Sequence, residues 1–479
     1  MCGVIGIYGN DDVVYEIYEG LIALQHRGQD SCGIITYNGM FHLKRGMGLV
    51  NNVFNEKNIA RLKGKIGIGH VRYPTIGVGS LEDAQPFYIN YPFGIAMAHN
   101  GNVTNYYELR ELLEKRFYRK LTSYSDVEVI LNMFGVFLEK HIDTKNFFNA
   151  LCEATKQVFK YVKGSYSVVG IIADYGIFAF RDPYGIKPLV FGKKNNNCYA
   201  FASESVAFDM LDFELIRDVY PGEIIFIDKD RKVYSKRLKR EKRNYPCIFE
   251  YVYFARPDSI IDGIGVYEAR LRLGEELGKE CLKENIQPDV VIPVPDTARA
   301  AAFSVSKILK VDCKEGLIKN RYIPRTFIMP TQKEREIKVR QKLNPIKSEI
   351  ENKKVLVVDD SIVRGTTSKE IVLLLRKTKA KEVYLAITCP PLRFPCVYGI
   401  DMMTRGEFIA RKYSIEKIKE IIGADKLIYQ TIEGLIRAVG GGKRKDFCTA
   451  CFTGIYPTKI KKKEIEKLEK ERIKQKIIL

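Results

Sequence analysis

The chain has 479 residues, of which 46% are hydrophobic and 28% are charged. This length exceeds what one ordinary core accommodates, so it predicts two large domains of globular composition. No segment approaches the roughly 18 consecutive apolar residues of a transmembrane helix, and the first residues lack the pattern of a signal or transit peptide. We therefore expect a soluble cytoplasmic protein with no membrane partner.

The net charge of +20 raises the question of nucleic-acid binding. Much of the excess lies in residues 236–243 and 459–479, and neither segment alternates basic with aromatic residues. No zinc-finger, RNP or GXXG signature is present. We interpret the two segments as a solvated linker and a solvated tail helix, and we expect no nucleic-acid partner. A basic surface also suits small, highly anionic substrates.

Residues 1 to about 235 combine short strands with a few helices. Apolar or alternating runs predict strands at 4–8, 33–37, 65–70, 95–99, 167–173 and 177–181. Helical periodicity is found at 14–26, 104–117, 126–140 and 147–162. This order favours sheets layered with helices.

Beyond the basic linker the pattern changes to parallel α/β. Continuous apolar strands at 290–294, 354–358 and 383–388 alternate with helices at 297–310 and 366–379. Such strands indicate a parallel sheet covered on both faces. The predicted divisions are a first domain at 2–235, a linker at 236–246, a second domain at 247–457 and a helical tail at 458–479.

The sequence begins Met1-Cys2-Gly3-Val4. If Met1 is removed, Cys2 carries both a nucleophilic thiol and a free α-amine. That amine has an ordinary pKa of about 7.7–8.0, so it can act as a base near neutral pH. The alternative is a small side chain that merely starts a buried strand.

The segment 354–368 is the most specific motif of the chain. A buried strand ends in Asp359 and Asp360, and a loop with a glycine and three hydroxyl residues then opens a helix. Backbone amides and the helix dipole at such a loop can hold a phosphate. Paired acids at the carboxyl end of a strand can bind ribose hydroxyls or a Mg²⁺ carried by pyrophosphate. The alternative is an Asp-rich turn with a Thr or Ser helix cap.

This motif resembles the phosphoribosyl pyrophosphate (PRPP) signature of type I phosphoribosyltransferases. The resemblance implies that the loop holds the 5-phosphate and that the acids bind ribose, directly or through one Mg²⁺ per subunit. Thr297, in a second strand-end loop, is the implied further Mg²⁺ contact. A basic, proline-containing segment between the loops resembles the lid that closes over PRPP. The implied PRPP-binding residues are Asp359, Asp360, Arg364, Gly365, Thr366, Thr367, Ser368, Arg321, Tyr322 and Lys342.

In the first half, short motifs follow Cys2 at 25–31, 69–75, 98–103 and 123–126. In this order they resemble N-terminal-nucleophile glutamine amidotransferases, which implies a four-layer αββα domain. Cys2 would attack the side-chain amide of glutamine, and Asn100 and Gly101 would form the oxyanion hole. The implied glutamine-binding residues are Arg72 for the α-carboxylate, Asp126 for the α-ammonium, and Arg27 and Gly28 on a closing loop.

Both halves in one chain resemble the amidophosphoribosyltransferase family. The resemblance implies that PRPP, glutamine and water give 5-phosphoribosylamine, glutamate and pyrophosphate, the first committed step of purine synthesis de novo. It also implies a homotetramer that purine nucleotides inhibit by feedback. Two alternatives stay open at this point. One is another amidotransferase, such as a hexosamine-phosphate synthase, a glutamate synthase or an asparagine synthetase. The other is a PRPP-binding regulator of transcription.

The eleven cysteines form no pattern typical of a secreted disulfide framework. Cys448 and Cys451 form a CxxC that by itself could be a zinc site, a redox pair or chance. One branch of the family binds a [4Fe–4S] cluster through cysteines in the contexts of Cys247, Cys396, Cys448 and Cys451. The resemblance therefore implies one cluster per subunit, with zinc or four metal-free thiols as alternatives. We interpret Cys389 and the remaining cysteines as core residues.

Overall fold

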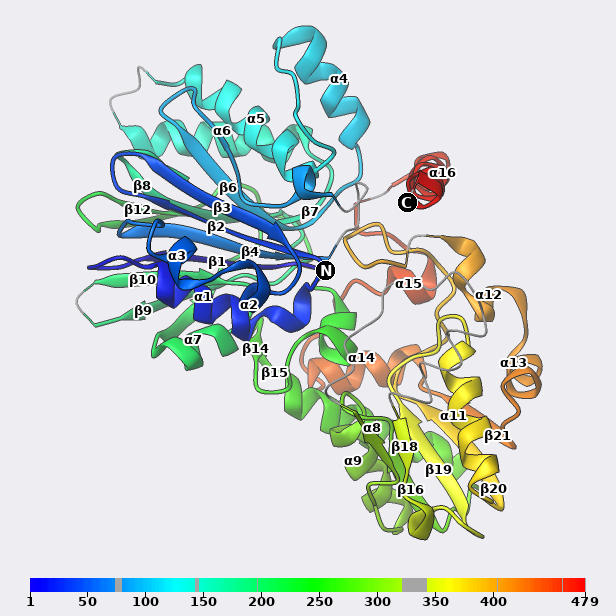
Figure 1. Ribbon diagram of the computed structural model, residues 1–479. Coiled ribbons are helices and arrows are strands. Elements are labelled where there is room, and N and C mark those ends of the chain that lie inside the picture. The colour runs from blue at the N-terminus through cyan, green and yellow to red at the C-terminus, as the bar shows by residue number, and fades with distance from the viewer. Residues whose placement is uncertain are drawn as a thin grey trace.

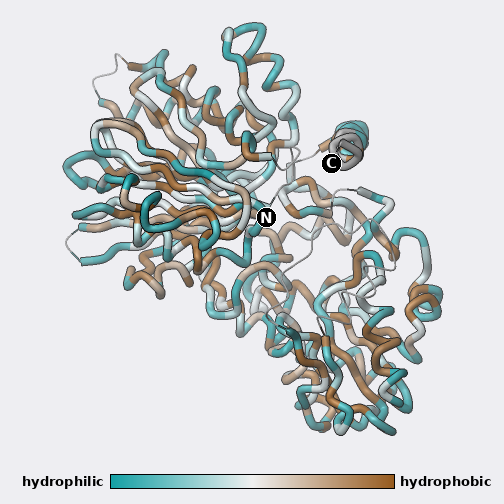
Figure 2. The backbone as a smooth tube through the Cα atoms, viewed as in Figure 1, coloured by the Kyte–Doolittle hydropathy of each residue, from teal (hydrophilic) through white to brown (hydrophobic). Residues whose placement is uncertain are grey.

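The computed structural model describes residues 1–73, 80–142, 146–195, 197–320, 343–402, 404–458 and 460–478. The chain forms two α/β halves, and its N-terminus lies where they meet (Figure 1). Figure 2 shows apolar residues concentrated in the strands of both halves, as expected where sheets are buried. None of the helices in these ranges is long and apolar enough to cross a membrane.

Two antiparallel sheets form the centre of the first half, with strand orders β11-β9-β10-β1-β4-β2-β3 and β13-β12-β8-β7-β6-β5. The seven strands of the first sheet are β1 (Gly3–Tyr8), β2 (Ser31–Tyr37), β3 (Phe41–Met47), β4 (Ile66–Arg72), β9 (Val190–Lys194), β10 (Cys198–Ala202) and β11 (Glu214–Asp218). The six strands of the second are β5 (Phe87–Ile89), β6 (Ile95–Val103), β7 (Gly164–Ile172), β8 (Gly176–Arg181), β12 (Glu223–Asp228) and β13 (Val233–Arg237). Apolar side chains from both sheets pack together in one core between them.

Helices cover the outer face of each sheet, and each packs its apolar side chains on that face. The helices on the seven-stranded sheet are α1 (Val14–Ala23), α7 (Val206–Leu211) and the short α2 (Val50–Val53) and α3 (Glu56–Ile59). Those on the six-stranded sheet are α4 (Tyr106–Arg116), α5 (Asp126–Glu139) and α6 (Phe147–Tyr161). The four-layer αββα prediction is confirmed. Since β13 runs to Arg237, the first residues of the predicted linker belong to the sheet.

The second half contains the predicted parallel sheet, with strand order β16-β19-β20-β21. Its strands are β16 (Val290–Pro293), β19 (Lys354–Asp359), β20 (Glu382–Ile387) and β21 (Lys426–Tyr429). Residues of α8 (Val266–Lys283) and α9 (Arg299–Leu309) pack on one face. Residues of α11 (Thr366–Lys377), α13 (Ile415–Ile422) and α14 (Ile432–Gly440) belong to the core on the other.

Smaller elements connect and extend this half. They include two antiparallel ribbons, formed by β14 (Ile260–Ile261) with β15 (Ile264–Gly265) and by β17 (Leu317–Lys319) with β18 (Leu343–Pro345). The short helices are α12 (Ile409–Lys412) and α15 (Ala450–Thr453). The tail forms α16 (Lys462–Ile478), whose side chains Ile465 and Leu468 are buried. Its Glu469 forms an ion pair with Arg405, with Oε2 3.0 Å from Nε.

Candidate active site

Cys2 lies directly before β1, a central strand of its sheet, and is buried. Its backbone N donates to Asn100 Oδ1 at 3.2 Å, and its Sγ lies 3.7 Å from the carbonyl oxygen of Tyr73. Asn100 belongs to β6 in the facing sheet. The packing of the two sheets therefore brings the predicted nucleophile to the predicted oxyanion residue.

The amide of Asn100 is held by one end only. Its Oδ1 accepts from Cys2, while its buried Nδ2 has no hydrogen-bond partner among the described residues. Buried polar groups are nearly always paired, so an unpaired donor needs an explanation. Gly101 follows on the same strand. A preorganised donor beside a thiol is what stabilisation of an oxyanion requires.

Met1 is also buried, and Lys187 Nζ lies 2.7 Å from its Sδ. Burial lowers the pKa of the Met1 amine to about 6. Lys187 is itself fully buried, although nothing in its sequence context marks it as part of the site. The Met1 side chain therefore occupies interior space at the junction of the two halves rather than solvent.

Two predicted glutamine-binding residues, Arg72 and Asp126, are buried on the strand and helix next to Cys2 and Asn100. Arg72 ends β4, and its Nη2 lies 3.6 Å from Asp83 Oδ2. Asp126 begins α5; its Oδ2 accepts from the Val103 amide at 2.9 Å and lies 3.4 Å from His99 Nε2. Burial alone would raise the pKa of Asp126, but His99, the Val103 amide and the charge of Arg72 outweigh it and lower that pKa. The site thus offers a cation and an anion for an α-amino acid.

Gly28 follows the turn η1 (Gln25–Arg27) and lies against the end of β4. A Cβ at Gly28 would lie 2.6 Å from the carbonyl carbons of both Val71 and Arg72. A side chain does not fit there, so Gly28 allows the turn to approach the strand that presents Arg72.

Arg27 occupies a different environment from the predicted one. Its buried guanidinium donates to the Cys2 carbonyl oxygen at 2.9 Å, to Glu250 at 2.9 and 3.1 Å, and to Glu204. Burial alone would lower the pKa of Arg27, but the two carboxylates outweigh it and raise that pKa. The guanidinium faces the nucleophile's backbone and two glutamates, so this geometry does not support the predicted role in glutamine binding.

Glu204 and Glu250 are the two carboxylates that pair with Arg27, and neither lies in a recognisable sequence motif. Glu204 follows β10 and also accepts from the Arg256 amide at 2.9 Å and from Ser259 Oγ at 2.7 Å. Glu250 opens the helical turn η3 (Glu250–Phe254) at the start of the second half. A buried ion network therefore joins the nucleophile to the junction between the halves.

The phosphate loop runs from the end of β19 to the start of α11. Asp359 and Asp360 are buried at the carboxyl end of the strand. Burial and the adjoining Asp360 carboxylate raise the pKa of Asp359 well above its ordinary value. Gly365 precedes α11 with φ of +80° and provides no side-chain cap. The first N–H groups of a helix without such a cap are suited to bind a phosphate.

Three predicted hydroxyl residues, Thr366, Thr367 and Ser368, form the first turn of α11. Arg364, by contrast, is exposed and donates to the Glu407 carboxylate.

The two strand-end loops meet at the predicted Mg²⁺ position. Thr297 Oγ1 donates to Asp360 Oδ2, and Ser361 Oγ donates to Asp360 Oδ1 at 2.6 Å. The Val294 amide donates to the Val358 carbonyl at 2.9 Å and joins the two strand ends. The structure thus brings together Thr297 and Asp360. The predicted lid residues Arg321, Tyr322 and Lys342 lie outside the described residues, between β17 and β18.

The four predicted ligand cysteines are all buried. Cys247 pairs with Cys448 through an isolated parallel bridge, and Cys451 O accepts from the amides of residues 393 and 394, near Cys396. Burial raises the pKa of Cys247 to about 11 and, together with the charges of the neighbouring cysteines, raises the pKa of Cys448 and Cys451 well above the ordinary value. Within the described ranges, no three or more Cys, His, Asp or Glu side chains already surround a metal position.

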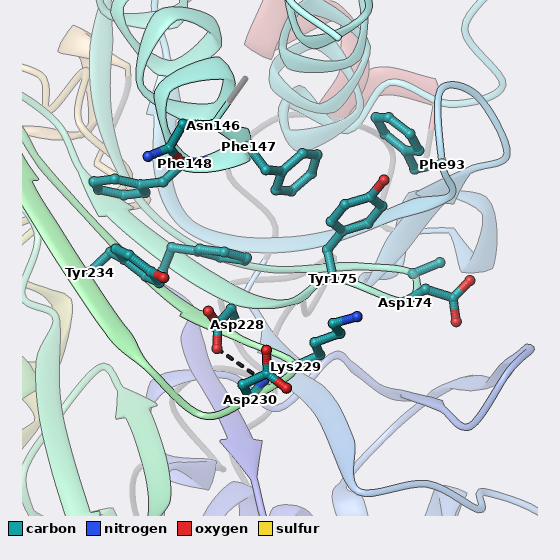
Figure 3. Close-up of a pocket in the computed structure, with 12 residues that line it drawn as sticks. Phe93, Asn146, Phe147, Phe148, Asp174, Tyr175, Asp228, Lys229, Asp230 and Tyr234 are labelled. Atoms are coloured by element: carbon teal, nitrogen blue, oxygen red, sulfur yellow. Dashed lines mark hydrogen bonds between the residues drawn. The ribbon is translucent and has the colours of Figure 1, made fainter. Parts of the chain in front are cut away.

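A cavity of about 730 Å³ lies elsewhere in the first half. It opens between the start of α6, the β7–β8 turn and the β12–β13 hairpin, and Figure 3 shows its aromatic rings and aspartates. Phe147 and Tyr175 stack there with ring centroids 3.8 Å apart. None of the predicted site residues lines this cavity, so it is separate from the candidate site.

Comparison with known proteins supports both halves. Residues 70–210 match a family described as a glutamine amidotransferase domain, and residues 264–394 match one described as a phosphoribosyl transferase domain. The amidophosphoribosyltransferase of Pseudomonas aeruginosa is 48% identical over 466 residues, which cover 96% of this chain and 93% of that protein. The chain belongs to the amidophosphoribosyltransferase family.

Other amidophosphoribosyltransferases match over the same length. Those of Escherichia coli and Saccharomyces cerevisiae are 46% and 43% identical, covering 96% and 98% of this chain and 93% and 95% of theirs. A solved structure described as glutamine PRPP amidotransferase from B. subtilis complexed with ADP and GMP has a TM-score of 0.86 at 38% identity, covering 96% of this chain and 98% of that one. Matches that span both halves decide between the alternatives, because other amidotransferases and PRPP-binding regulators resemble one half only.

Proposed function

We propose that the chain makes 5-phosphoribosylamine, glutamate and pyrophosphate from PRPP, glutamine and water, the first committed step of purine synthesis de novo. Membership of the amidophosphoribosyltransferase family supports this reaction. The observation that carries the proposal is the position of Asn100 beside Cys2. Its Oδ1 accepts from Cys2 N, and its Nδ2 has no partner among the described residues and can donate to an oxyanion.

In this proposal Met1 is removed, and the Cys2 N that lies 3.2 Å from Asn100 Oδ1 becomes a free amine. The thiol attacks the side-chain amide carbon of glutamine and passes its proton to this amine. Asn100 Nδ2 and the Gly101 amide stabilise the oxyanion. The protonated amine then gives its proton to the amide nitrogen, and the tetrahedral intermediate expels ammonia and leaves a thioester on Cys2. Water hydrolyses the thioester to glutamate.

Arg72 and Asp126 orient glutamine in this step. A guanidinium can bind the α-carboxylate through two hydrogen bonds. The lowered pKa of Asp126 keeps its carboxylate charged at neutral pH, where it can pair with the α-ammonium. Binding through both groups fixes the amide against the thiol, which lowers the entropic part of the barrier.

In the second half, the first turn of α11 binds the 5-phosphate of PRPP, and Asp359 and Asp360 bind the ribose. Ammonia attacks C1 of the ribose, the bond to pyrophosphate breaks, and the amine loses a proton. One Mg²⁺ per subunit, held near Thr297 and the two aspartates, would offset the charge of the departing pyrophosphate. The contact of Thr297 with Asp360 supports this placement.

Replacement of Cys2 and of Asp360 tests whether glutamine is hydrolysed in the first half and PRPP is used in the second. Cys2→Ala should abolish pyrophosphate release with glutamine as the nitrogen donor and retain it with ammonia. Asp360→Asn should reduce release with either donor, because both donors use the same PRPP site. A Cys2→Ala protein that still used glutamine would contradict the proposal.

We propose further that Cys247, Cys396, Cys448 and Cys451 hold one [4Fe–4S] cluster per subunit. All four are buried, and Cys451 is coupled electrostatically to the other three, which supports a site where they would bind a metal as thiolates. Zinc is the competing metal for four thiolates. Four irons and four acid-labile sulfides per chain in anaerobically purified protein would support the cluster, and one zinc would contradict it.

We also propose that purine nucleotides inhibit the enzyme and that it forms a homotetramer. The inhibition is supported by the B. subtilis structure, a complex with ADP and GMP, and by a second match of TM-score 0.86 described as the allosteric regulatory enzyme of purine biosynthesis. The tetramer is what the resemblance to the family implies. Inhibition assays with ADP and GMP, and light scattering of the purified protein, test the two statements. Unchanged rates or a monomeric mass would refute them.

A further inference from the structure

A loop of the second half crosses to the strand that carries Asn100 and Gly101. The loop begins at Cys396, and its carbonyl groups accept hydrogen bonds from the first half. Asn102 Nδ2 donates to the Val397 carbonyl and Ser165 Oγ donates to the Tyr398 carbonyl, both at 2.9 Å and both buried. The loop is therefore attached directly to β6 and β7.

The closest approach is at Gly399. A Cβ at this residue would lie 2.7 Å from the carbonyl oxygen of Gly101 and 3.0 Å from its carbonyl carbon. These are backbone atoms, so they cannot rotate away as a flexible side chain would. Gly101 is also confined by β7, because a Cβ on Gly101 would lie 2.0 Å from the Ser165 carbonyl oxygen. Any group added at Gly399 must therefore displace either the loop or the oxyanion strand.

The same loop also approaches Tyr73, whose carbonyl oxygen lies beside the nucleophile. Asp401 Oδ2 lies 3.5 Å from the hydroxyl of Tyr73. The carbonyl oxygen of Tyr73 in turn lies 3.7 Å from Cys2 Sγ. The loop thus contacts Tyr73, beside the thiol, as well as the strand that carries Asn100 and Gly101.

The loop is also held firmly within its own half. The Cys396 amide donates to the Met402 carbonyl at 2.8 Å, which closes the loop on itself. The Tyr398 hydroxyl lies 2.8 Å from Thr458 Oγ1, and the Tyr456 hydroxyl donates to the Pro395 carbonyl at 2.7 Å. A loop fixed at this many points can impose a position on the strand that it contacts.

We propose that residues 396–401 form a positioning loop for the glutaminase site, and that Gly399 is its positioning residue. Gly399 lets the loop reach the backbone of Gly101 and so sets where the oxyanion donors of β6 stand relative to Cys2. This inference rests on the proposed role of Asn100 and Gly101 in the oxyanion hole. It makes the second half a structural part of the site that hydrolyses glutamine.

The test is Gly399→Ala in the full chain, with Gly39→Ala as its matched control. Both glycines have φ of +99°, but a Cβ at Gly39 meets nothing within 4 Å. The control therefore reproduces the backbone strain without the collision. Loss of one oxyanion donor typically lowers kcat by about 10²–10³-fold. For a displaced donor we expect a fall in glutamine-dependent kcat of at least about 10-fold, with KM for glutamine changed by less than about threefold.

Three further measurements make the outcome decisive. Ammonia-dependent pyrophosphate release by Gly399→Ala should stay within about twofold of the unsubstituted enzyme, because PRPP binds elsewhere. Asn102→Ala removes one of the loop's hydrogen bonds without adding volume, and should lower glutamine-dependent kcat by about threefold or more even if Gly399→Ala does not fold. Asn100→Ala tests the oxyanion hole itself.

The outcomes separate the inference from the function on which it rests. Unchanged kcat in Asn100→Ala would refute the proposed oxyanion hole. A large loss in Asn100→Ala, with glutamine-dependent kcat retained in the folded Gly399→Ala or Asn102→Ala protein, would overturn the positioning loop alone. Equal losses in Gly399→Ala and Gly39→Ala would overturn it too, because strain rather than contact would then be the cause.

Discussion

Replacing Arg27 by methionine tests whether this arginine is structural. Its guanidinium and both carboxylates that it pairs with, Glu204 and Glu250, are essentially inaccessible to solvent. Removing one partner of a buried ion pair typically costs about 3–5 kcal/mol, because the remaining charge stays buried and uncompensated. For a domain of 150–250 residues this corresponds to a fall in Tm on the order of 10 °C.

Thermal unfolding at several pH values measures the effect. Burial alone would raise the pKa of Glu204, but His26 and Arg27 lower it below its ordinary value. The ion pair therefore stabilises the fold above the unfolded-state pKa of about 4.3, and this stability is lost as the pH falls. In Arg27→Met, Glu204 keeps only His26 as a charged partner, so it takes up a proton more readily as the pH drops. The difference in Tm between the two proteins should thus be largest near pH 7.5 and should shrink towards pH 5.

Two controls complete this experiment. Arg437→Met removes an exposed arginine that donates to Glu276 at 2.6 Å, and such pairs contribute less than about 1 kcal/mol. Arg27→Met combined with Glu204→Gln and Glu250→Gln removes the two buried negative charges that Arg27 offsets, and should recover part of the lost stability. If Arg27→Met lowered Tm no more than Arg437→Met while raising KM for glutamine, the ion network would be unimportant and Arg27 would bind substrate as the sequence predicts.

Three other predictions follow from particular residues. Cys396→Ser should lose the iron of the purified protein and Cys389→Ser should keep it, and the reverse iron contents would refute the ligand assignment. Asp126→Asn removes the anion proposed for the α-ammonium, and should raise KM for glutamine at least about 10-fold while ammonia-dependent activity is retained, so an unchanged KM would exclude that role. Burial and the charge of Asp262 raise the pKa of Asp218 to about 6, so the folded protein holds this proton more tightly than the unfolded chain and loses stability as the pH rises from about 4 to about 6. Asp218→Asn should lack that decline in Tm, and an identical pH dependence in both proteins would contradict it.

The sequence allows the parts of the site that end a strand or open a helix to be predicted. Asp359 and Asp360 follow a continuous apolar strand, and the structure has them at the carboxyl end of β19. Asn100 directly follows the predicted strand at 95–99, which becomes the start of β6 (Ile95–Val103). In these cases a local pattern determines the element, and the element determines the position of the residue.

Contacts between distant segments could not be predicted in this way. Glu204 and Glu250 are single glutamates in connecting segments, and only the folded junction shows that they share Arg27. Gly399 lies in a turn-like stretch, and its importance depends on the backbone of Gly101 nearly 300 residues away in the chain. A motif identifies which residue types are present, but the partners of a buried charge or a buried glycine depend on how the domains pack.

The most direct test of the central claim is to follow glutamate and pyrophosphate together, with and without PRPP and Mg²⁺, in the full-length protein. We expect the two products to appear in equal amounts and only when PRPP and Mg²⁺ are present, because ammonia released at Cys2 is used in the second half. Glutamate without pyrophosphate in the presence of all substrates would contradict it, since the second half would then not accept nitrogen from the first.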